Sequence, residues 1–157
     1  MAIPWKPEGH SSVGVKCRMA SSYHTKDKGD LGVLKAQLDL FEQGYTVLLP
    51  LTEHSPFDLV AYRDGNFRRI QVKYRALDRS GKVEIKFSTC WADRNGTHTV
   101  PVDKGEVDLY CVYCPDSDEC YYLEPDSFGS NASLRVRTPR NGQTKGVRFA
   151  ADFRRAP

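Results

Sequence analysis

Long apolar runs are missing from this chain of 157 residues. No stretch reaches the roughly 18 apolar residues of a membrane-spanning helix, so we expect a soluble protein that does not enter a membrane. The N-terminal residues also lack the apolar segment of about 7–15 residues that marks a secretory signal, which favours a cytoplasmic location. No internal repeat is visible, and the length suits one domain with a proper core better than two.

Cysteine occurs in too irregular a pattern for a disulfide framework, because the count is five and a cytoplasmic compartment keeps thiols reduced. Cys111 and Cys114 form a Cys-x-x-Cys pair, but a zinc site would need two further ligands at suitable spacing and only Cys120 is near. The pair stands among aromatic residues in a strand-like pattern. We therefore predict buried strand cysteines, with a zinc site as the alternative.

A large excess of one charge is lacking too, since the formal net charge is only +3. The distribution is nevertheless uneven. Residues 62–86 contain eight Lys or Arg against three acids, residues 134–157 contain seven against one, and residues 103–126 contain eight acids against one Lys. Such segregation suits a protein that turns one face toward a polyanion such as nucleic acid. A solvated face of charged strands is the alternative.

The first 25 residues are rich in Ser, Gly and Pro without a hydrophobic period, which predicts a disordered or peripheral arm before a domain spanning residues 26–157. From Asp27 the pattern becomes helical, with one apolar stripe that we expect to face the core, namely Leu31, Leu34, Leu38 and Phe41. Gly44 stands where a C-terminal cap belongs. At 100° per residue, Asp30 lies about 20° from Phe41, so its carboxylate is expected at the sheet margin.

Alternating apolar residues predict strands at 45–51, 57–62 and 67–75, and the Asp64-Gly65 pair between the last two indicates a hairpin. Further strands are expected at 83–90, 107–113, 120–123 and 134–138, and a short helix at 149–153. A helix followed by meandering strands predicts a mixed α/β or α+β domain with an antiparallel core.

The hairpin carries residues suited to hydrolysing a phosphodiester. Period-two alternation places Gln71 and Lys73 on the same face of one strand, and Asp58 belongs to the preceding strand. Hydrolysis needs a divalent cation that neutralises the phosphate and activates water, and a positive group near the nucleophile. Asp58 offers a carboxylate, Gln71 an amide oxygen and Val72 a backbone carbonyl to Mg²⁺, and Lys73 offers the positive group. Solvent-facing strand residues with a capping acid are the alternative.

Ser55-Pro56-Phe57-Asp58 and Gln71-Val72-Lys73 resemble the PD-(D/E)XK nuclease motif in its Gln-x-Lys variant, with Asp58 thirteen positions before Gln71. The chain from Lys26 onward is similar in particular to group I intron-associated homing endonucleases and their freestanding bacterial relatives. The resemblance implies a restriction-endonuclease-like core with a mixed central sheet and an N-terminal helix, Mg²⁺ or Mn²⁺ as cofactor, and double-stranded DNA as the partner. It also implies a homodimer or homotetramer, because one site cuts one strand.

The same resemblance implies a role for each motif residue. Asp58 becomes the metal-bridging carboxylate, Gln71 replaces the usual second acid, and Lys73 becomes the catalytic lysine. Members of the family often carry a Glu on the first helix where this chain has Val33, and Asp30 is the nearby acid that would substitute. Because a neutral amide oxygen binds Mg²⁺ less tightly than a carboxylate, we expect weak metal affinity or a site completed by DNA phosphate.

Basic residues near the motif are the candidates for DNA contacts, namely Arg68, Arg69, Arg75, Lys82, Lys86, Arg94 and His98. The arginines beside the motif are expected to meet phosphates, which fix position without reading sequence. The others belong to or adjoin residues 91–105, a segment between two strands that is long enough for a binding loop. The sequence thus predicts a metal-dependent DNA endonuclease. A DNA-binding relative without turnover and a resolvase of four-way (Holliday) junctions are the alternatives.

Overall fold

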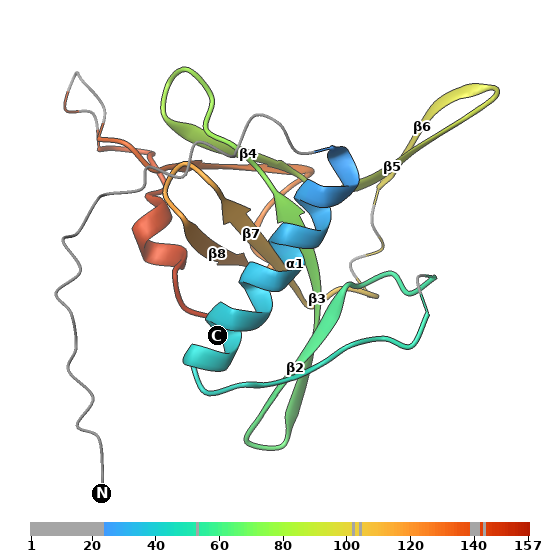
Figure 1. Cartoon of the computed structure of the whole chain (residues 1–157). Helices are drawn as coiled ribbons and strands as arrows, with labels where there is room; N and C mark the ends of the chain where they lie inside the picture. The colour runs from blue at the N-terminus through green and yellow to red at the C-terminus, as the bar shows by residue number, and fades with distance from the viewer. Residues whose placement is uncertain (1–23, 53, 102, 104, 139–141, 143) are drawn as a thin grey trace, which may run out of the picture.

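A computed structural model describes residues 24–52, 54–101, 103, 105–138, 142 and 144–157 (Figure 1). Of the arm expected at residues 1–25, only the last two residues are among them. Helix α1 (Thr25–Glu42) leads the described part, and its nine strands are β1 (Thr46–Leu48), β2 (Leu59–Arg63), β3 (Asn66–Tyr74), β4 (Lys82–Lys86), β5 (Ser88–Asp93), β6 (Gly96–Pro101), β7 (Leu109–Cys114), β8 (Glu119–Leu123) and β9 (Asn131–Arg135). Two short 3-10 helices are η1 (Pro125–Ser127) and η2 (Ala150–Phe153). No described helix is long and apolar enough to cross a membrane.

Both ends of α1 follow from local chemistry. At the start, the backbone N–H of His24 donates to Oδ2 of Asp27 at 3.1 Å, one half of a capping box. At the other end, Gly44 adopts a φ of +85°, and its N–H donates to the carbonyl of Phe41 at 3.0 Å. The terminal glycine predicted from the sequence is therefore confirmed, because a left-handed residue after a helix favours glycine.

Of the four residues in the apolar stripe expected to face the core, Leu31 packs against it and the other three do not. Leu34, Leu38 and Phe41 are exposed, and the buried positions of α1 are Gly32, Ala36 and Leu40. A Cβ atom on Gly32 would lie only 3.5 Å from Cγ1 of Val72 and 3.6 Å from Cβ of Tyr74. The prediction was wrong because α1 approaches the sheet so closely that small residues, rather than leucines, form most of the contact.

The central sheet is mixed, with its strands in the order β1-β2-β3-β7-β8. The predicted hairpin is confirmed, since β2 pairs antiparallel with β3 and the turn residues Asp64 and Gly65 both have positive φ, 52° and 83°. The antiparallel core predicted from the meander was wrong at the centre, where β3 and β7 run parallel. The crossover between these strands contains β4, β5 and β6, so sequence order alone could not reveal their pairing.

Each face of the central sheet has its own hydrophobic cluster. On one face, Ile70 and Cys111 pack with Leu40 of α1. On the other face, Tyr110 and Val112 pack with side chains from the smaller β4–β9 sheet, from β8 and from η2. Successive side chains of β3 and β7 therefore point to different clusters, and all six residues of β7 are buried. Residues of even number in β3 face α1, and residues of odd number face the second cluster.

Two other predicted strands differ from the observed elements. The strand expected at 83–90 is divided into β4 and β5, and β5 pairs with β6 in a separate two-stranded sheet. Figure 1 shows this ribbon projecting from the body. Residues 91–101 of the expected binding loop at 91–105 therefore belong to a hairpin. The strand predicted at 134–138 lies at Asn131–Arg135, and the short terminal helix is confirmed as η2.

Replacing Gly32 by Ala should raise the free energy of unfolding by about 0.5–1 kcal/mol, because the new methyl group meets the sheet at ordinary contact distances and Ala favours helix. Gly32→Leu should lower it by about 1–3 kcal/mol, because a large side chain overpacks this interface. Urea unfolding of both variants measures the difference. An equal gain for both would mean that α1 does not touch the sheet through Gly32.

Candidate active site

Asp58 immediately precedes Leu59, the first residue of β2. Its backbone N–H donates to the carbonyl of Ile70 at 2.9 Å, which extends the pairing with β3 by one step. Its carboxylate then accepts a hydrogen bond from the backbone N–H of Val72, with 2.6 Å between Oδ2 and N. The carboxylate thus accepts a hydrogen bond that would otherwise go to the backbone of a neighbouring strand. This hydrogen bond fixes the carboxylate at the end of β2.

The environment of Asp58 opposes its charge. Burial raises the pKa of the carboxyl above its ordinary value of 3.8, and the Val72 N–H and the positive charge of Lys73 only partly offset this effect. Desolvation of a carboxylate without full compensation is typical of functional sites, because a structural role would favour a paired or solvated acid. A bound cation would supply the missing compensation.

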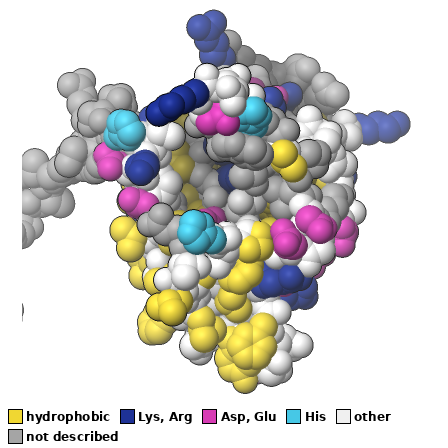
Figure 2. All heavy atoms as spheres, turned by 90° about the vertical axis from the view of Figure 1, so that its right-hand side faces the viewer, with side chains coloured by type: hydrophobic (Ala, Val, Ile, Leu, Met, Phe, Trp, Pro, Cys, Tyr) yellow, Lys and Arg dark blue, Asp and Glu magenta, His cyan; other side chains and the backbone are white. Residues whose placement is uncertain are grey.

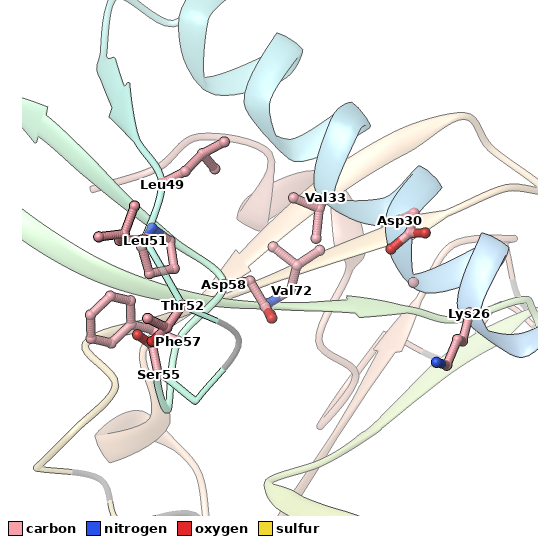
Figure 3. A pocket seen from close by; sticks show the side chains of 12 residues that line it. Lys26, Asp30, Val33, Leu49, Leu51, Thr52, Ser55, Phe57, Asp58 and Val72 are labelled. Carbon is pink, nitrogen blue, oxygen red and sulfur yellow. The ribbon is translucent and has the colours of Figure 1, made fainter.

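A hollow with a volume of about 650 Å³ opens beside Asp58. It lies between the first turns of α1 and the segment that links β1 to β2, and it is lined by Lys26, Gly29, Asp30, Val33, Leu49, Pro50, Leu51, Thr52, Ser55, Phe57, Asp58 and Val72. Figure 3 shows Asp30 and Asp58 on two sides of this space, with Val33 and Val72 between them. The two carboxylates named from the sequence therefore line the same hollow.

Gln71 and Lys73 approach Asp58 from another direction. Neither lines the hollow, because both face the second hydrophobic cluster, away from α1. Burial lowers the pKa of Lys73, the nearby charge of Arg75 lowers it further, and Asp58 opposes the shift. Asp58 and Lys73 therefore act on each other electrostatically, each favouring the charged form of the other.

Gln71 and Tyr110 present polar atoms that lack partners. They are paired neighbours on β3 and β7, and both the Oε1 atom of Gln71 and the hydroxyl of Tyr110 are buried without a hydrogen-bond partner in the described part of the protein. Burial and the charge of Asp58 raise the pKa of Tyr110 to about 12. Unsatisfied buried polar atoms cost about 1–3 kcal/mol each, so their presence beside Asp58 indicates a place for a ligand or water.

Sequence reasoning did not identify Tyr110. The segment around Cys111 was interpreted only as a buried strand, and that part is confirmed, since Cys111, Cys114 and Cys120 are all buried. Its position beside Gln71 depends on the parallel pairing of β3 with β7. Only knowledge of this parallel pairing would have connected Tyr110 to the site.

The oxygen atoms of these residues suit a hard divalent cation. The carboxylate of Asp58 and the free oxygen of Gln71 are oxygen ligands, and Asp30 lines the adjoining hollow. No group of three or more His, Cys, Asp or Glu capable of holding a metal occurs in the residues that the structure describes. A cation here would therefore keep several water or phosphate ligands, which is the usual behaviour of Mg²⁺.

The candidate DNA-contact residues are spread over several elements. Arg69 is engaged within the protein, where its Nε and Nη2 atoms donate to the two carboxylate oxygens of Asp108 at 3.0 and 2.8 Å. Arg68 is partly exposed on the face of β3 that also carries Val72. The remaining candidates are Arg75 after β3, Lys82 and Lys86 on β4, and Arg94 and His98 on the β5–β6 ribbon, where His98 Nε2 lies 3.0 Å from Oδ1 of Asp93.

The fold is shared with a bacterial homing endonuclease, I-Ssp6803I, whose structure matches 84% of this chain and 89% of its own with a TM-score of 0.69 and 23% identity. This similarity confirms the mixed central sheet with an N-terminal helix. The model of the PD-(D/E)XK endonuclease family matches residues 23–156. The chain therefore belongs to the PD-(D/E)XK endonuclease family. No curated protein matches it by sequence.

The raised pKa of Asp58 predicts how stability depends on pH. The folded chain binds this proton more tightly than the unfolded chain, so the contribution of Asp58 to stability decreases as pH rises from 3.8 through the folded-state pKa. Asp58→Asn keeps an oxygen for the Val72 N–H and removes the charge. Its Tm should exceed that of the unchanged protein at pH 7, at about 2–4 °C per kcal/mol for a chain of this size. The difference should shrink below pH 4, and a lower Tm at pH 7 would contradict the burial of this charge.

Proposed function

We propose that this member of the PD-(D/E)XK endonuclease family is a Mg²⁺-dependent enzyme that hydrolyses phosphodiester bonds in double-stranded DNA. The observation that carries the proposal is the partly buried carboxylate of Asp58, which is held by the Val72 N–H and is influenced by the charge of Lys73. Burial of a purely structural acid at this position would only cost free energy. In a site that receives a cation and a phosphate, the same burial strengthens the attraction between the carboxylate and the cation.

The proposed ligands of the cation are Asp58, Gln71 and the backbone carbonyl of Val72, with Asp30 as an outer acid across the hollow. When bound, Mg²⁺ or Mn²⁺ would neutralise the phosphate and lower the pKa of the attacking water. Asp58 is fixed before any ligand arrives, because its hydrogen bond to Val72 sets the direction of the carboxylate. Gln71 presents an oxygen without a competing partner in the described residues, which leaves it available to the ligand.

Lys73 is proposed as the catalytic lysine. Burial and Arg75 lower its pKa, so its proton is more easily given up than that of an exposed lysine. As an ammonium group it would stabilise the negative charge that develops on the phosphate, and it would orient the water that attacks. Both roles require the side chain to stay near Asp58, which the electrostatic effect between the two groups supports.

The assembly and setting proposed from the sequence accompany this activity. A homodimer or homotetramer would bring together the two sites that a double-strand break needs. A cytoplasmic location is proposed from the sequence alone. DNA binding is proposed for Arg68, Arg75, Lys82, Lys86, Arg94 and His98, whereas Arg69, the other candidate from the sequence, is held by Asp108.

Cleavage of supercoiled plasmid and of a mixed-sequence duplex library tests the activity. The protein should cut with Mg²⁺ or Mn²⁺ and not with EDTA. Asp58→Ala and Lys73→Ala should each lower the cleavage rate by about 100-fold or more, because each removes a group that acts on the reacting phosphate. Asp126→Ala, which removes an acid at an exposed position outside the site, is the control for Asp58→Ala and should cut normally.

Three outcomes of this experiment would redirect the proposal. Tight DNA binding without cutting under any metal would favour a binding protein that has lost turnover, because Gln71 and Val33 stand where acids would bind the metal more tightly. Faster cutting of four-way junctions than of linear duplex would favour a junction resolvase. Equal cutting by Asp58→Ala and the unchanged protein would remove Asp58 from the reaction.

The two neighbouring arginines of β3 should behave differently in DNA binding measured with Ca²⁺ in place of Mg²⁺. Arg68→Ala should reduce the slope of log K against log salt by about 1, as expected for one lost phosphate contact. Arg69→Ala should lower Tm, because Asp108 loses its bidentate partner. A reduced salt slope for Arg69→Ala with unchanged Tm would assign that guanidinium to DNA instead.

A further inference from the structure

A row of polar residues crosses the central sheet at the level of Asp58. The register that pairs Leu59 with Ile70, continued by one residue, places Asp58 opposite Gln71. On its other side, Gln71 pairs with Tyr110 of the parallel strand β7. Paired residues of neighbouring strands point to the same face of a sheet, so Gln71 and Tyr110 project together toward the second hydrophobic cluster. Gln71 thus lies between a carboxylate and a hydroxyl in the sheet.

The hydroxyl of Tyr110 has no structural partner among the described residues. The side chain is 0% exposed, and its ring packs edge-on against Phe87 with 4.8 Å between the ring centroids. The other buried members of the cluster are apolar except Cys114, four positions farther along β7, and Tyr121, whose hydroxyl is already hydrogen-bonded. The unpartnered Oε1 atom of Gln71 is therefore the acceptor that the row places beside Tyr110.

An amide ligand needs to be oriented in a way that a carboxylate does not. A carboxylate presents an oxygen to a cation after any half-turn, whereas a half-turn of an amide exchanges its oxygen for an NH2 group, which repels a cation. The terminal torsion of glutamine has a broad energy minimum, so Gln71 turns freely unless a neighbour holds it. A carbonyl oxygen has two lone pairs, so Oε1 can accept a hydrogen bond and still face a cation.

We propose that Tyr110 is a positioning residue for Gln71: its hydroxyl donates a hydrogen bond to Oε1 and holds this oxygen toward the cation site beside Asp58. The inference rests on the proposed function, because it assigns a partner to a ligand of the proposed cation. Burial and the charge of Asp58 raise the pKa of Tyr110 to about 12, so the hydroxyl keeps its proton at neutral pH and remains a donor. Loss of a group that orients a metal ligand typically lowers metal affinity by about 10–100-fold.

Tyr110 acts through Gln71 because no part of its own side chain is exposed to a substrate. Figure 2 shows the side of the molecule that carries the segment between β1 and β2, with acidic, basic and histidine side chains above an apolar region. DNA that lies on this surface would contact those side chains, whereas Tyr110 lies inside the second cluster. The expected effect of Tyr110 is therefore on the cation and not on DNA contacts.

The affinity for Mn²⁺ tests the proposal, measured from the electron paramagnetic resonance signal of the free ion with the full chain and a short mixed-sequence duplex. Tyr110→Phe removes only the hydroxyl and should lower the affinity about tenfold. Gln71→Glu should bind Mn²⁺ more tightly than the unchanged protein, because its carboxylate is charged. In the Gln71→Glu background, Tyr110→Phe should cost less than about twofold, because either carboxylate oxygen can face the cation. Asp58→Ala corrects for Mn²⁺ bound elsewhere on the protein and on the duplex.

Tyr121→Phe is the matched control, because it removes another buried hydroxyl from the same cluster, and it should leave the Mn²⁺ affinity unchanged. A purely structural Tyr110 predicts a different result, in which Tyr110→Phe raises Tm by removing an unpartnered buried group and does not affect Mn²⁺ binding. That result, or an equal loss of affinity in both backgrounds, would overturn the proposal and leave the cation site intact. An unchanged protein that binds no more Mn²⁺ than Asp58→Ala would overturn the proposed cation site as well.

Discussion

The hydrogen bond from the Val72 N–H to the carboxylate of Asp58 is the constraint on which the site depends. It replaces a contact that a continued β2 would have made with β3, so the side chain occupies a position normally taken by backbone. Its direction is therefore fixed by the sheet and not by its own rotamer freedom. The remaining parts of the site, Lys73 on β3 and the hollow beside α1, are arranged around this one fixed carboxylate.

The site stores free energy that the rest of the fold must offset. Asp58 and Lys73 are both partly desolvated, and Gln71 and Tyr110 each bury a polar atom without a partner in the described residues. Two hydrophobic clusters on the two faces of the sheet hold these groups in place. Such unfavourable features gather at functional sites because a ligand that satisfies them binds more tightly there.

How much of this arrangement was predictable depends on how local each feature is. The hairpin turn at Asp64-Gly65 and the glycine after α1 follow from backbone conformations that few residues adopt, and both predictions were confirmed. The exposed face of α1 was mistaken for the buried one, because helical periodicity reports an apolar stripe without saying what covers it. The parallel pairing of β3 and β7 joins residues about forty positions apart, and no local pattern contains that information.

Anomalous diffraction from crystals grown with Mn²⁺ and a short DNA duplex tests the central claim most directly, since it locates the cation without reference to activity. The account predicts an anomalous peak about 2.0–2.5 Å from the carboxylate of Asp58, with the amide oxygen of Gln71 turned toward it. A fully ordered complex with DNA in the hollow and no peak at Asp58, or a peak bound only by other residues, would contradict it.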